Sequence, residues 1–209
     1  MKYKVIKFTF ESMDFDPFKK RISELNTLKP NKGNILVAEP FMQDDYFKRS
    51  VVYICENNAD GTVGFILNEQ LDLKLSEVIT EELSFDAQLY LGGPVEARSL
   101  FFIHRCPDLR DSIQITEGIY WSGDFEMLKE LIILEKVSID ELRFFLGYSG
   151  WDEQQLKDEL KKESWLIGKI MEKDLFNVNS SNDLWKTTLQ QMGKEQALLS
   201  TFPDNPNLN

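Results

Sequence analysis

The residues of this chain whose types and spacing could perform nucleophilic chemistry are a histidine and a cysteine. His104 and Cys106 are two positions apart, so on an extended strand their side chains would lie on the same face. A thiolate beside an imidazole is a known nucleophile arrangement. However, Pro107 follows immediately and ends a strand there, which lets the two side chains diverge. We favour a structural role for both residues and expect no catalytic residue.

The rest of the sequence excludes several common catalytic designs. The chain has one histidine, so a multi-histidine metal site is impossible and a Ser-His-Asp triad would have to use His104. There is no phosphate-binding loop with Lys-Ser/Thr, no dinucleotide fingerprint, no Cys-x-x-Cys, no His-Glu-x-x-His and no Gly-x-Ser-x-Gly elbow. We therefore expect neither a cofactor nor a metal ion.

Two adjacent glycines offer a candidate binding element. Gly92 and Gly93 follow a short apolar run and precede Pro94. Backbone N–H groups of consecutive glycines can converge on an anion. Glycines serve equally well in a tight turn or a close approach of two backbones, which is their commoner use. The tripeptide by itself is weak evidence for binding.

Charged and aromatic residues supply two further candidate surfaces. Asp44 and Arg49 precede an apolar strand and could clamp a polar ligand, although an internal ion pair between them is the commoner arrangement. Tyr148 and Trp151 stand beside Gly147 and Gly150 and could form the aromatic wall of a pocket. Aromatic residues at such positions more often pack in the core.

The periodicity of apolar residues indicates the elements that would position these side chains. Strands are predicted at residues 34–38, 50–55, 62–67, 88–91, 100–104, 112–115, 118–121, 143–148 and 165–171. Helices are predicted at residues 16–28, 75–83, 125–134, 152–162 and 183–192, and a capping box at 138–141. The turn at 57–61 joins two strands into a hairpin.

These elements predict the fold class and one sharp bend. Continuous apolar strands indicate burial on both faces, hence an α/β or α+β single domain with a mixed, hairpin-containing central sheet covered by helices. The segment 147–151, Gly-Tyr-Ser-Gly-Trp, lies between an apolar run and a charged helical segment. Its two glycines predict a sharp turn of the backbone at that point.

Composition and charge suggest how the chain is organised and what it could bind. The net charge of −11 opposes direct binding to nucleic acid. Residues 1–32 carry eight Lys/Arg against four Asp/Glu, a net charge of +4, which leaves −15 for residues 33–209. We expect a basic N-terminal extension with a short helix (1–32), a main domain (33–200) and a frayed polar tail (201–209).

Nothing in the sequence suggests secretion or a membrane. No apolar run approaches the ~20 residues that span a bilayer, and residues 1–10 lack the apolar stretch of a signal peptide. Two cysteines in a chain of this length are not a disulfide scaffold. We expect a cytoplasmic bacterial-type protein, and the oligomeric state is not determined by the sequence.

Several motifs occur together in a fixed order over most of the main domain. They are Gly33-x-Ile35-Leu-Val-Ala38-x-Pro40-x-Met42-x-Asp44-x-x-Phe47-x-Arg49-Ser-Val-Val-Tyr-Ile-Cys55-Glu56, Gly61-x-x-Gly64-Phe-Ile-Leu-Asn68, Gly92-Gly93-Pro94-Val95, Leu100-Phe101 leading to His104, Gly118-x-Tyr120 with Ser122-Gly123, and Phe145-x-Gly147-Tyr148-x-Gly150-Trp151 with Gln155-Leu156, Glu159 and Trp165. In this combination the chain resembles the AlgH (YqgE-like) family of largely uncharacterised bacterial proteins.

The resemblance implies one α/β domain, a cytoplasmic location and the family's label of transcriptional regulator. It attaches no catalytic mechanism and no cofactor. This chain departs from the pattern at two positions, since it has Asn57 where the family usually has histidine, and Gln154 where it usually has glycine. The missing histidine weakens the hypothesis that the protein is an enzyme.

Our leading hypothesis is a non-enzymatic regulatory or interaction protein that acts through a protein partner. The residues best placed for a shared surface are Asp44, Arg49, Asn68, Gly92, Gly93, His104, Tyr148 and Trp151. The alternative is a small-molecule binder or enzyme with a cleft near Gly92-Gly93 and Gly147–Trp151. A third hypothesis gives the basic extension the main role, through salt-sensitive contact with an anionic partner.

Overall fold

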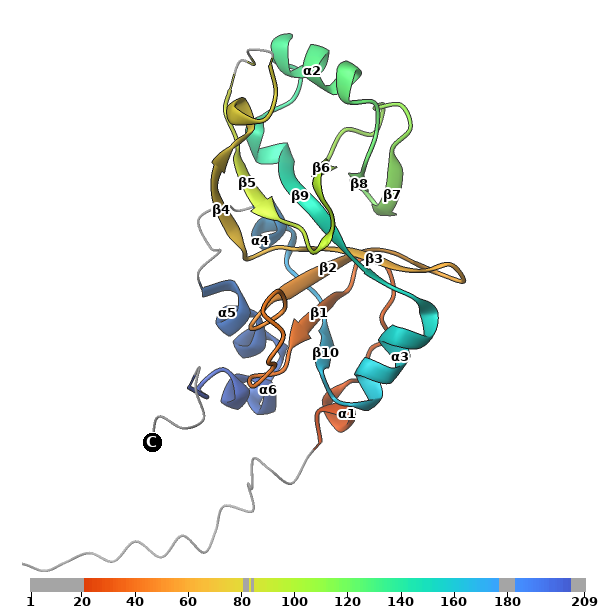
Figure 1. The fold of residues 1–209 in the computed structure, drawn as a ribbon, viewed down its shortest axis with the longest axis vertical. Helices are drawn as coiled ribbons and strands as arrows, with labels where there is room; N and C mark the ends of the chain where they lie inside the picture. The colour runs from red at the N-terminus through yellow and green to blue at the C-terminus, as the bar shows by residue number, and fades with distance from the viewer. Residues whose placement is uncertain (1–20, 81–82, 84, 177–182, 204–209) are drawn as a thin grey trace, which may run out of the picture.

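The computed structural model describes residues 21–80, 83, 85–176 and 183–203 (Figure 1). Its strands are β1 (Ile35–Ala38), β2 (Val51–Asn58), β3 (Gly61–Ile66), β4 (Gln70–Lys74), β5 (Gln88–Leu91), β6 (Val95–His104), β7 (Ile113–Thr116), β8 (Ile119–Trp121), β9 (Leu142–Trp151) and β10 (Trp165–Gly168). The α-helices are α1 (Ile22–Leu25), α2 (Phe125–Ile133), α3 (Glu153–Lys161), α4 (Glu172–Phe176), α5 (Leu184–Met192) and α6 (Lys194–Leu199). Two 3-10 turns, η1 (Leu75–Glu77) and η2 (Ile139–Glu141), complete the described elements.

The strands form one large and mostly antiparallel sheet. Its order is β10-β1-β2-β3-β9-β6-β8-β7, and β4 and β5 branch from β9. The predicted hairpin is confirmed as β2 and β3, which pair antiparallel. β5 and β9 pair parallel, so the sheet is mixed as predicted. The fold is α+β, and its helices cover less of the sheet than we predicted.

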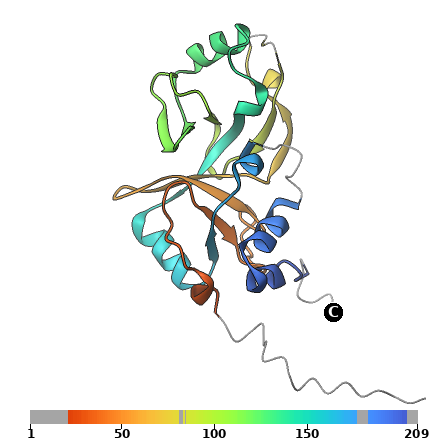
Figure 2. The same ribbon diagram turned by 180° about the vertical axis from the view of Figure 1, so that it is seen from behind.

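The molecule has two halves that share the long strand β9. The lower half in Figure 1 contains β1, β2, β3 and β10 with α1, α3, α5 and α6, and the upper half contains β4 to β8 with α2. Figure 2 shows from behind that α4 lies between the two halves. β9 pairs with β3 near its carboxyl end and with β5 and β6 near its start. β9 therefore contributes residues to both halves of the molecule.

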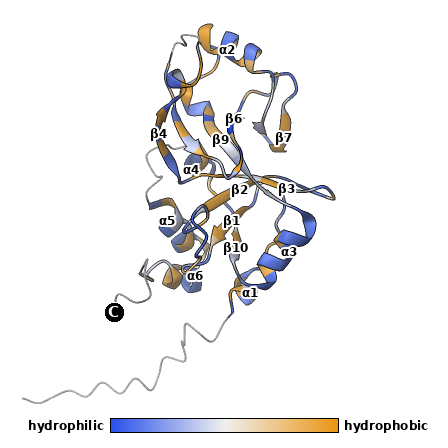
Figure 3. Cartoon of the chain, viewed as in Figure 1, coloured by the Kyte–Doolittle hydropathy of each residue, from blue (hydrophilic) through white to orange (hydrophobic). Residues whose placement is uncertain are grey.

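The lower sheet is buried on both faces, as its continuous apolar strands predicted. Ile35 and Val37 of β1 pack in the core cluster that includes Leu184, Trp185 and Leu189 of α5. Leu36 and Ala38 point to the other face, where they share a cluster with Leu156 of α3. Alternation with period two sends successive side chains to opposite faces. Figure 3 shows these strands as hydrophobic, with hydrophilic residues on the outer side of α3.

The edge strand β10 is closed by a side chain. Asn26, just after α1, donates from its amide nitrogen to Trp165 O at 2.9 Å and accepts from Ile167 N at 2.7 Å. The amide of Asn26 thus replaces the hydrogen bonds that a further strand would supply. Covering an edge in this way protects it from pairing with another chain.

Two local predictions were wrong. Among the described residues of the helix predicted at 75–83, Leu75–Glu77 alone are helical, and the strand β4 before it was not predicted. The alternation of Leu71 and Leu73 with polar neighbours is the strand signal that reveals β4. The turn predicted between the glycines of 147–151 is absent, because β9 runs through them to Trp151 and the chain bends at Asp152.

Three further predictions concern the helix from Asp16, the capping box at Ser138 and the polar tail, and the first and last of these lie partly outside the described residues. The helix predicted from Asp16 is described only from Ile22 to Leu25, and its start lies outside the described residues. The capping box at Ser138 exists, but it opens the short 3-10 turn η2. In the tail, Phe202 stacks on Phe41 with ring centroids 5.4 Å apart, and residues beyond 203 are outside the description.

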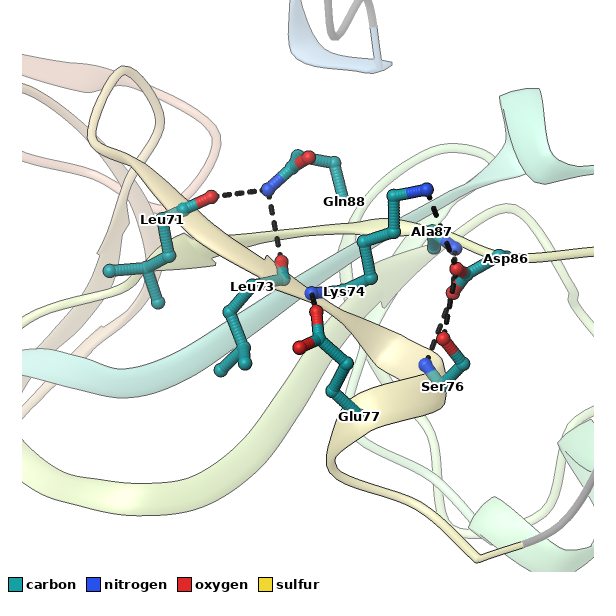
Figure 4. Close-up of polar contacts among 8 residues, drawn as sticks. All are labelled: Leu71, Leu73, Lys74, Ser76, Glu77, Asp86, Ala87 and Gln88. Carbon is teal, nitrogen blue, oxygen red and sulfur yellow. Dashed lines mark hydrogen bonds and ion pairs between the residues drawn. The ribbon is translucent and has the colours of Figure 1, made fainter.

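Side chains complete the pairing between β4 and β5 (Figure 4). The register between the two strands is irregular, and Gln88 fills the gap by donating to the carbonyl oxygens of Leu71 and Leu73. Beside it, the Asp86 carboxylate accepts hydrogen bonds from the backbone N and the Oγ of Ser76. This network joins β4 and η1 to the start of β5 in the upper half of the molecule.

Within the described residues, no helix is long and apolar enough to cross a membrane.

Candidate functional site

The histidine and cysteine that could have formed a nucleophile pair are both buried. His104 Nδ1 accepts a hydrogen bond from the backbone N of Cys106 at 3.1 Å, so the hydrogen of a neutral imidazole is on Nε2. Nε2 lies 2.9 Å from Ser122 O and 3.2 Å from Ser112 Oγ. The contact between the two residues thus uses the backbone of Cys106 and leaves its thiol out.

Burial also keeps both groups in their neutral forms. Desolvation lowers the pKa of His104, although its hydrogen bonds with Ser122 and Cys106 oppose this shift. Burial, aided by the charge of Glu141, raises the pKa of the Cys106 thiol to about 11. A thiolate–imidazolium pair is therefore not formed near neutral pH. Because His104 has no exposed surface, we leave it out of any binding surface.

The buried histidine makes stability depend on pH. The folded-state pKa of His104 is below its ordinary value of 6.5, so below about pH 6.5 the unfolded chain binds this proton more readily than the folded chain. The contribution of His104 to the free energy of unfolding should therefore fall as the pH drops from 6.5 through the folded-state pKa.

Proton NMR tests this directly, because His104 is the single histidine. Its Cε1–H resonance should titrate with a midpoint below pH 6.5 in the folded protein. A titration midpoint at or above pH 6.5 in the folded protein would contradict the assignment.

The glycine pair is a crossing point of two backbones. Gly92 N donates to Leu146 O at 2.8 Å, and Gly92 O accepts from Ile66 N and from Ser149 Oγ. Gly93 has a positive φ of 150°, and a Cβ there would lie 2.5 Å from Ser149 N. The N–H of Gly92 is thus used in the sheet, which leaves it unavailable to an anion. The close approach, the commoner use of such glycines, is the one observed.

Asp44 and Arg49 have separate partners, so they form neither a clamp nor an ion pair with each other. The Asp44 carboxylate accepts from the backbone N of Tyr46 at 2.9 Å and of Phe47 at 3.2 Å, which closes a turn. Arg49 donates from Nη2 to Phe202 O at 2.6 Å, and its guanidinium lies 4.5 Å from the centre of the Trp185 ring. Both residues fix the loop before β2.

The side chain of Asn68 also holds the loop before β2 in place. Its Oδ1 accepts from Val51 N at 2.8 Å, and its Nδ2 donates to Arg49 O at 2.9 Å. The side-chain amide therefore extends the pairing of β2 beyond the end of β3. Asn68 is used internally, and no local sequence pattern indicates this role.

Trp151 is part of an aromatic cluster beneath α3. Its ring lies 5.5 Å from that of Phe47 and 5.9 Å from that of Trp165. The indole N–H groups of Trp151 and Trp165 both donate to Glu159 Oε2, at 2.9 and 2.7 Å. This carboxylate satisfies two buried donors at once. The core interpretation of Trp151 is thus the one its contacts support.

Removing that carboxylate should destabilise the protein. We expect Glu159→Ala to lower the free energy of unfolding by about 2–3 kcal/mol, because two buried indole donors lose their acceptor. Glu159→Gln keeps one acceptor oxygen and should cost about 1 kcal/mol. Urea unfolding followed by tryptophan fluorescence measures both. Equal stability of the alanine variant and the parent chain would contradict the role of Glu159.

Tyr148 is the candidate residue that both reaches the surface and lines a hollow. Its half-buried ring packs edge-on against Phe101 at 5.5 Å. It also lines a hollow of about 390 Å³ between the β2–β3 hairpin and the end of β9. The carboxylate-bearing residues of this hollow are Glu56, Asp60 and Asp152. The hollow also includes Gly150 and Trp151, whereas Gly92 and Gly93 lie outside its lining.

The structure reveals a buried cation that our candidates omitted. Arg143 is 2% exposed, donates from Nη1 to Leu175 O at 2.6 Å and from Nη2 to Leu67 O, and lies 4.1 Å from the centre of the Tyr90 ring. Burial lowers its pKa to about 10, so it remains charged at neutral pH. Arg143 is the one charged residue in the apolar stretch 142–151, and that signal could have identified it.

The described residues contain no group of three or more His, Cys, Asp or Glu side chains arranged to hold a metal ion. The chemically reactive side chains of His104 and Cys106 are held by internal contacts. These features define a mixed-sheet α+β protein with an acidic hollow at its surface and with its histidine and both cysteines packed in its interior.

Comparison with known proteins gives the family. The AlgH-like family profile (DUF179) matches residues 35–197. A UPF0301 protein of Cytophaga hutchinsonii is 46% identical over 180 residues, 85% of this chain and 98% of the relative. A UPF0301 protein of Bacteroides thetaiotaomicron is 37% identical over 199 residues, 95% of this chain and 100% of the relative. The chain belongs to the AlgH-like family, which confirms the resemblance.

Solved structures support the same fold. A crystal structure of a protein from Corynebacterium diphtheriae has a TM-score of 0.72 and 26% identity, covering 88% of this chain and 100% of that one. The solution structure of the AlgH protein from Pseudomonas aeruginosa has a TM-score of 0.66 and 24% identity, covering 85% of this chain and 98% of that one. The second likeness concerns the fold alone.

Proposed function

We propose that this chain is a non-enzymatic, cytoplasmic interaction protein that acts by binding a protein partner. The observation that supports the proposal is that the reactive groups make their contacts inside the fold. His104 and Cys106 are neutral and buried, and Gly92 donates its N–H to the sheet. A surface that recognises another protein needs none of these groups.

We place the binding surface at the hollow beside Tyr148. Glu56, Asp60 and Asp152 give it negative charge, and the ring of Tyr148 gives it an aromatic wall. Carboxylates attract lysine and arginine side chains, and an aromatic face adds a cation–π contact. The partner segment that fits this surface is therefore basic.

A regulatory role in transcription would then operate through this partner. The net charge of −11 opposes direct binding to DNA phosphates, as expected from the sequence. Attraction between an acidic surface and a basic partner accelerates their encounter at low salt. This proposal accounts for the family's regulatory label without requiring a DNA-binding motif.

The test removes the aromatic wall and one carboxylate of the hollow. We expect the double substitution Tyr148→Ala with Asp60→Asn to weaken binding of the partner at least about ten-fold, since it removes an aromatic contact and a charge. Co-purification with the tagged protein, followed by a binding assay with the purified partner, provides the measurement. Asp45→Asn removes the same charge from an exposed loop and should leave the affinity unchanged.

The same preparation distinguishes the small-molecule alternative. Native mass spectrometry of the gently purified protein should show no reproducible small adduct that depends on Tyr148. Such an adduct, together with unchanged binding of the partner by the double variant, would contradict the interaction proposal. Retained, sequence-specific binding of a promoter fragment at moderate salt would contradict the indirect route to transcription.

A further inference from the structure

A second concave site lies between the two halves of the molecule. It has a volume of about 330 Å³ and is lined by four separate segments of the chain. Lys32 precedes β1, Tyr53 belongs to β2 and Thr116 ends β7. Lys169 follows β10, and Glu172 is the first residue of α4. We call this site the junction cleft. Small-molecule sites are often clefts of about 300–1,000 Å³ at the boundary between structural units.

The balance of charge in the junction cleft is positive. Lys32 is held in place by a hydrogen bond from Nζ to Gln114 O at 3.1 Å, which links it to β7. In the described part of the chain, no ion pair joins Lys169 to a carboxylate. Among the described lining residues, Glu172 is the one that bears a carboxylate, and it pairs with Arg105 at 3.8 Å. The described lining therefore holds two lysines and one glutamate, a formal charge of +1, and the pairing with Arg105 partly screens the glutamate.

The positive charge of the junction cleft is opposite in sign to the net charge of the whole chain. The net charge is −11, and the hollow beside Tyr148 is acidic. An anion is thus repelled by most of the surface and attracted to the junction cleft, because interactions between exposed charges decay over about 10 Å at ordinary salt. Lysine ammonium groups bind phosphate as compact point charges.

Tyr53 supplies a neutral donor to the same cleft. Its side chain is 2% exposed, and burial, the largest influence, raises its pKa well above the ordinary value. The phenol therefore keeps its proton throughout the physiological range. Its packing in the core cluster of the lower half holds the ring in place. A fixed O–H can donate to a ligand oxygen with little loss of conformational entropy.

Apolar side chains form the rest of the lining. Ile119 and the half-buried Ile170 contribute hydrocarbon surface to the cleft, with the fully buried Leu175 behind them. A ligand that fits the whole cleft carries a doubly charged anionic group, which the two lysines bind, and a small apolar group, which contacts the apolar lining. An inorganic anion would contact the lysines alone.

We propose that the junction cleft binds a small phosphate monoester, with its phosphate at Lys32 and Lys169, a hydrogen bond from Tyr53, and its organic group against Ile119 and Ile170. This site is distinct from the surface beside Tyr148 and does not rest on the proposed protein partner. The ligand would bridge the two halves of the fold, since its contacts come from both. Binding to the folded state alone also stabilises that state.

Phenyl phosphate and inorganic phosphate are the probes that test this site. We expect isothermal titration calorimetry at low ionic strength to show binding of both, with phenyl phosphate at least about three-fold tighter. Lys169→Gln and Tyr53→Phe should each weaken the binding of phenyl phosphate about ten-fold. Glu172→Gln removes the opposing carboxylate and should tighten binding roughly two- to three-fold.

Matched variants separate the cleft from general charge effects. Lys186→Gln removes an exposed lysine of α5 that is outside the cleft lining and should leave both affinities unchanged. Circular dichroism of each variant establishes that the fold is kept. The proposal is overturned if neither probe binds, or if Lys169→Gln and Lys186→Gln have equal effects. Weaker binding of phenyl phosphate than of inorganic phosphate would overturn the assignment of a monoester.

Discussion

Replacing Gly92 by alanine is expected to lower the free energy of unfolding by at least about 3 kcal/mol, through overpacking at the point where two backbones cross. A Cβ at this position would lie 2.2 Å from Gly147 O and 2.8 Å from Phe65 Cδ1. The first neighbour is backbone, so no change of rotamer relieves the clash. In a domain of this size, a loss of that magnitude lowers the melting temperature by about 6–12 °C, as measured by calorimetry.

Gly118 provides the matched control for this substitution. Its φ is +72°, and nothing lies within 4 Å of an added Cβ. Gly118→Ala therefore reports the cost of a left-handed backbone alone, about 1 kcal/mol. A loss for Gly92→Ala no larger than that for Gly118→Ala would show that the two backbones can separate at the crossing point.

Removing the guanidinium of Arg143 is the second substitution with a large expected effect. Arg143→Met keeps much of the side-chain volume but takes away the donors to the carbonyl oxygens of Leu67 and Leu175. These carbonyls belong to the end of β3 and to α4, so the side chain joins segments from different parts of the fold. We expect a loss of about 2–4 kcal/mol, measured by urea unfolding.

The charge of Arg143 is held without a carboxylate in the described structure. The face of Tyr90 and the last turn of α4 replace a counter-ion, since carbonyl groups at a helix C-terminus favour a cation. Arg143→Lys offers one ammonium group where two separated donors are needed, and should cost about 1–2 kcal/mol. An equally stable Arg143→Met variant would mean that desolvation of the charge offsets its hydrogen bonds.

Arg105 is the control for this second prediction. It also contacts the segment around α4, with its guanidinium 4.7 Å from the centre of the Phe176 ring and an ion pair to Glu172. Both charged groups are partly exposed, so solvent screens the pair. We expect Arg105→Met to cost about 1 kcal/mol or less. A larger loss than for Arg143→Met would contradict the special role of the buried arginine.

The sequence by itself determined most of the elements and the family. The continuous apolar strands around β1 and β2 predicted burial on both faces, and the Asn/Asp/Gly turn predicted the hairpin of β2 and β3. The helices α2 and α3 follow their Asp124 and Asp152 caps. These features depend on neighbours close in the chain, and short-range periodicity and capping are encoded in consecutive residues.

Only the tertiary structure decided what the candidate residues do. His104 meets Ser122, Gly92 meets Leu146, and Glu159 meets Trp151 and Trp165 through contacts between different strands and helices. Arg143 reaches Leu67, 76 positions away in sequence. A residue type and its spacing cannot specify such partners, because the free energy of a buried polar group depends on which distant group satisfies it. The same dependence gives the junction cleft its charge, since four segments must meet before its lysines face one ligand.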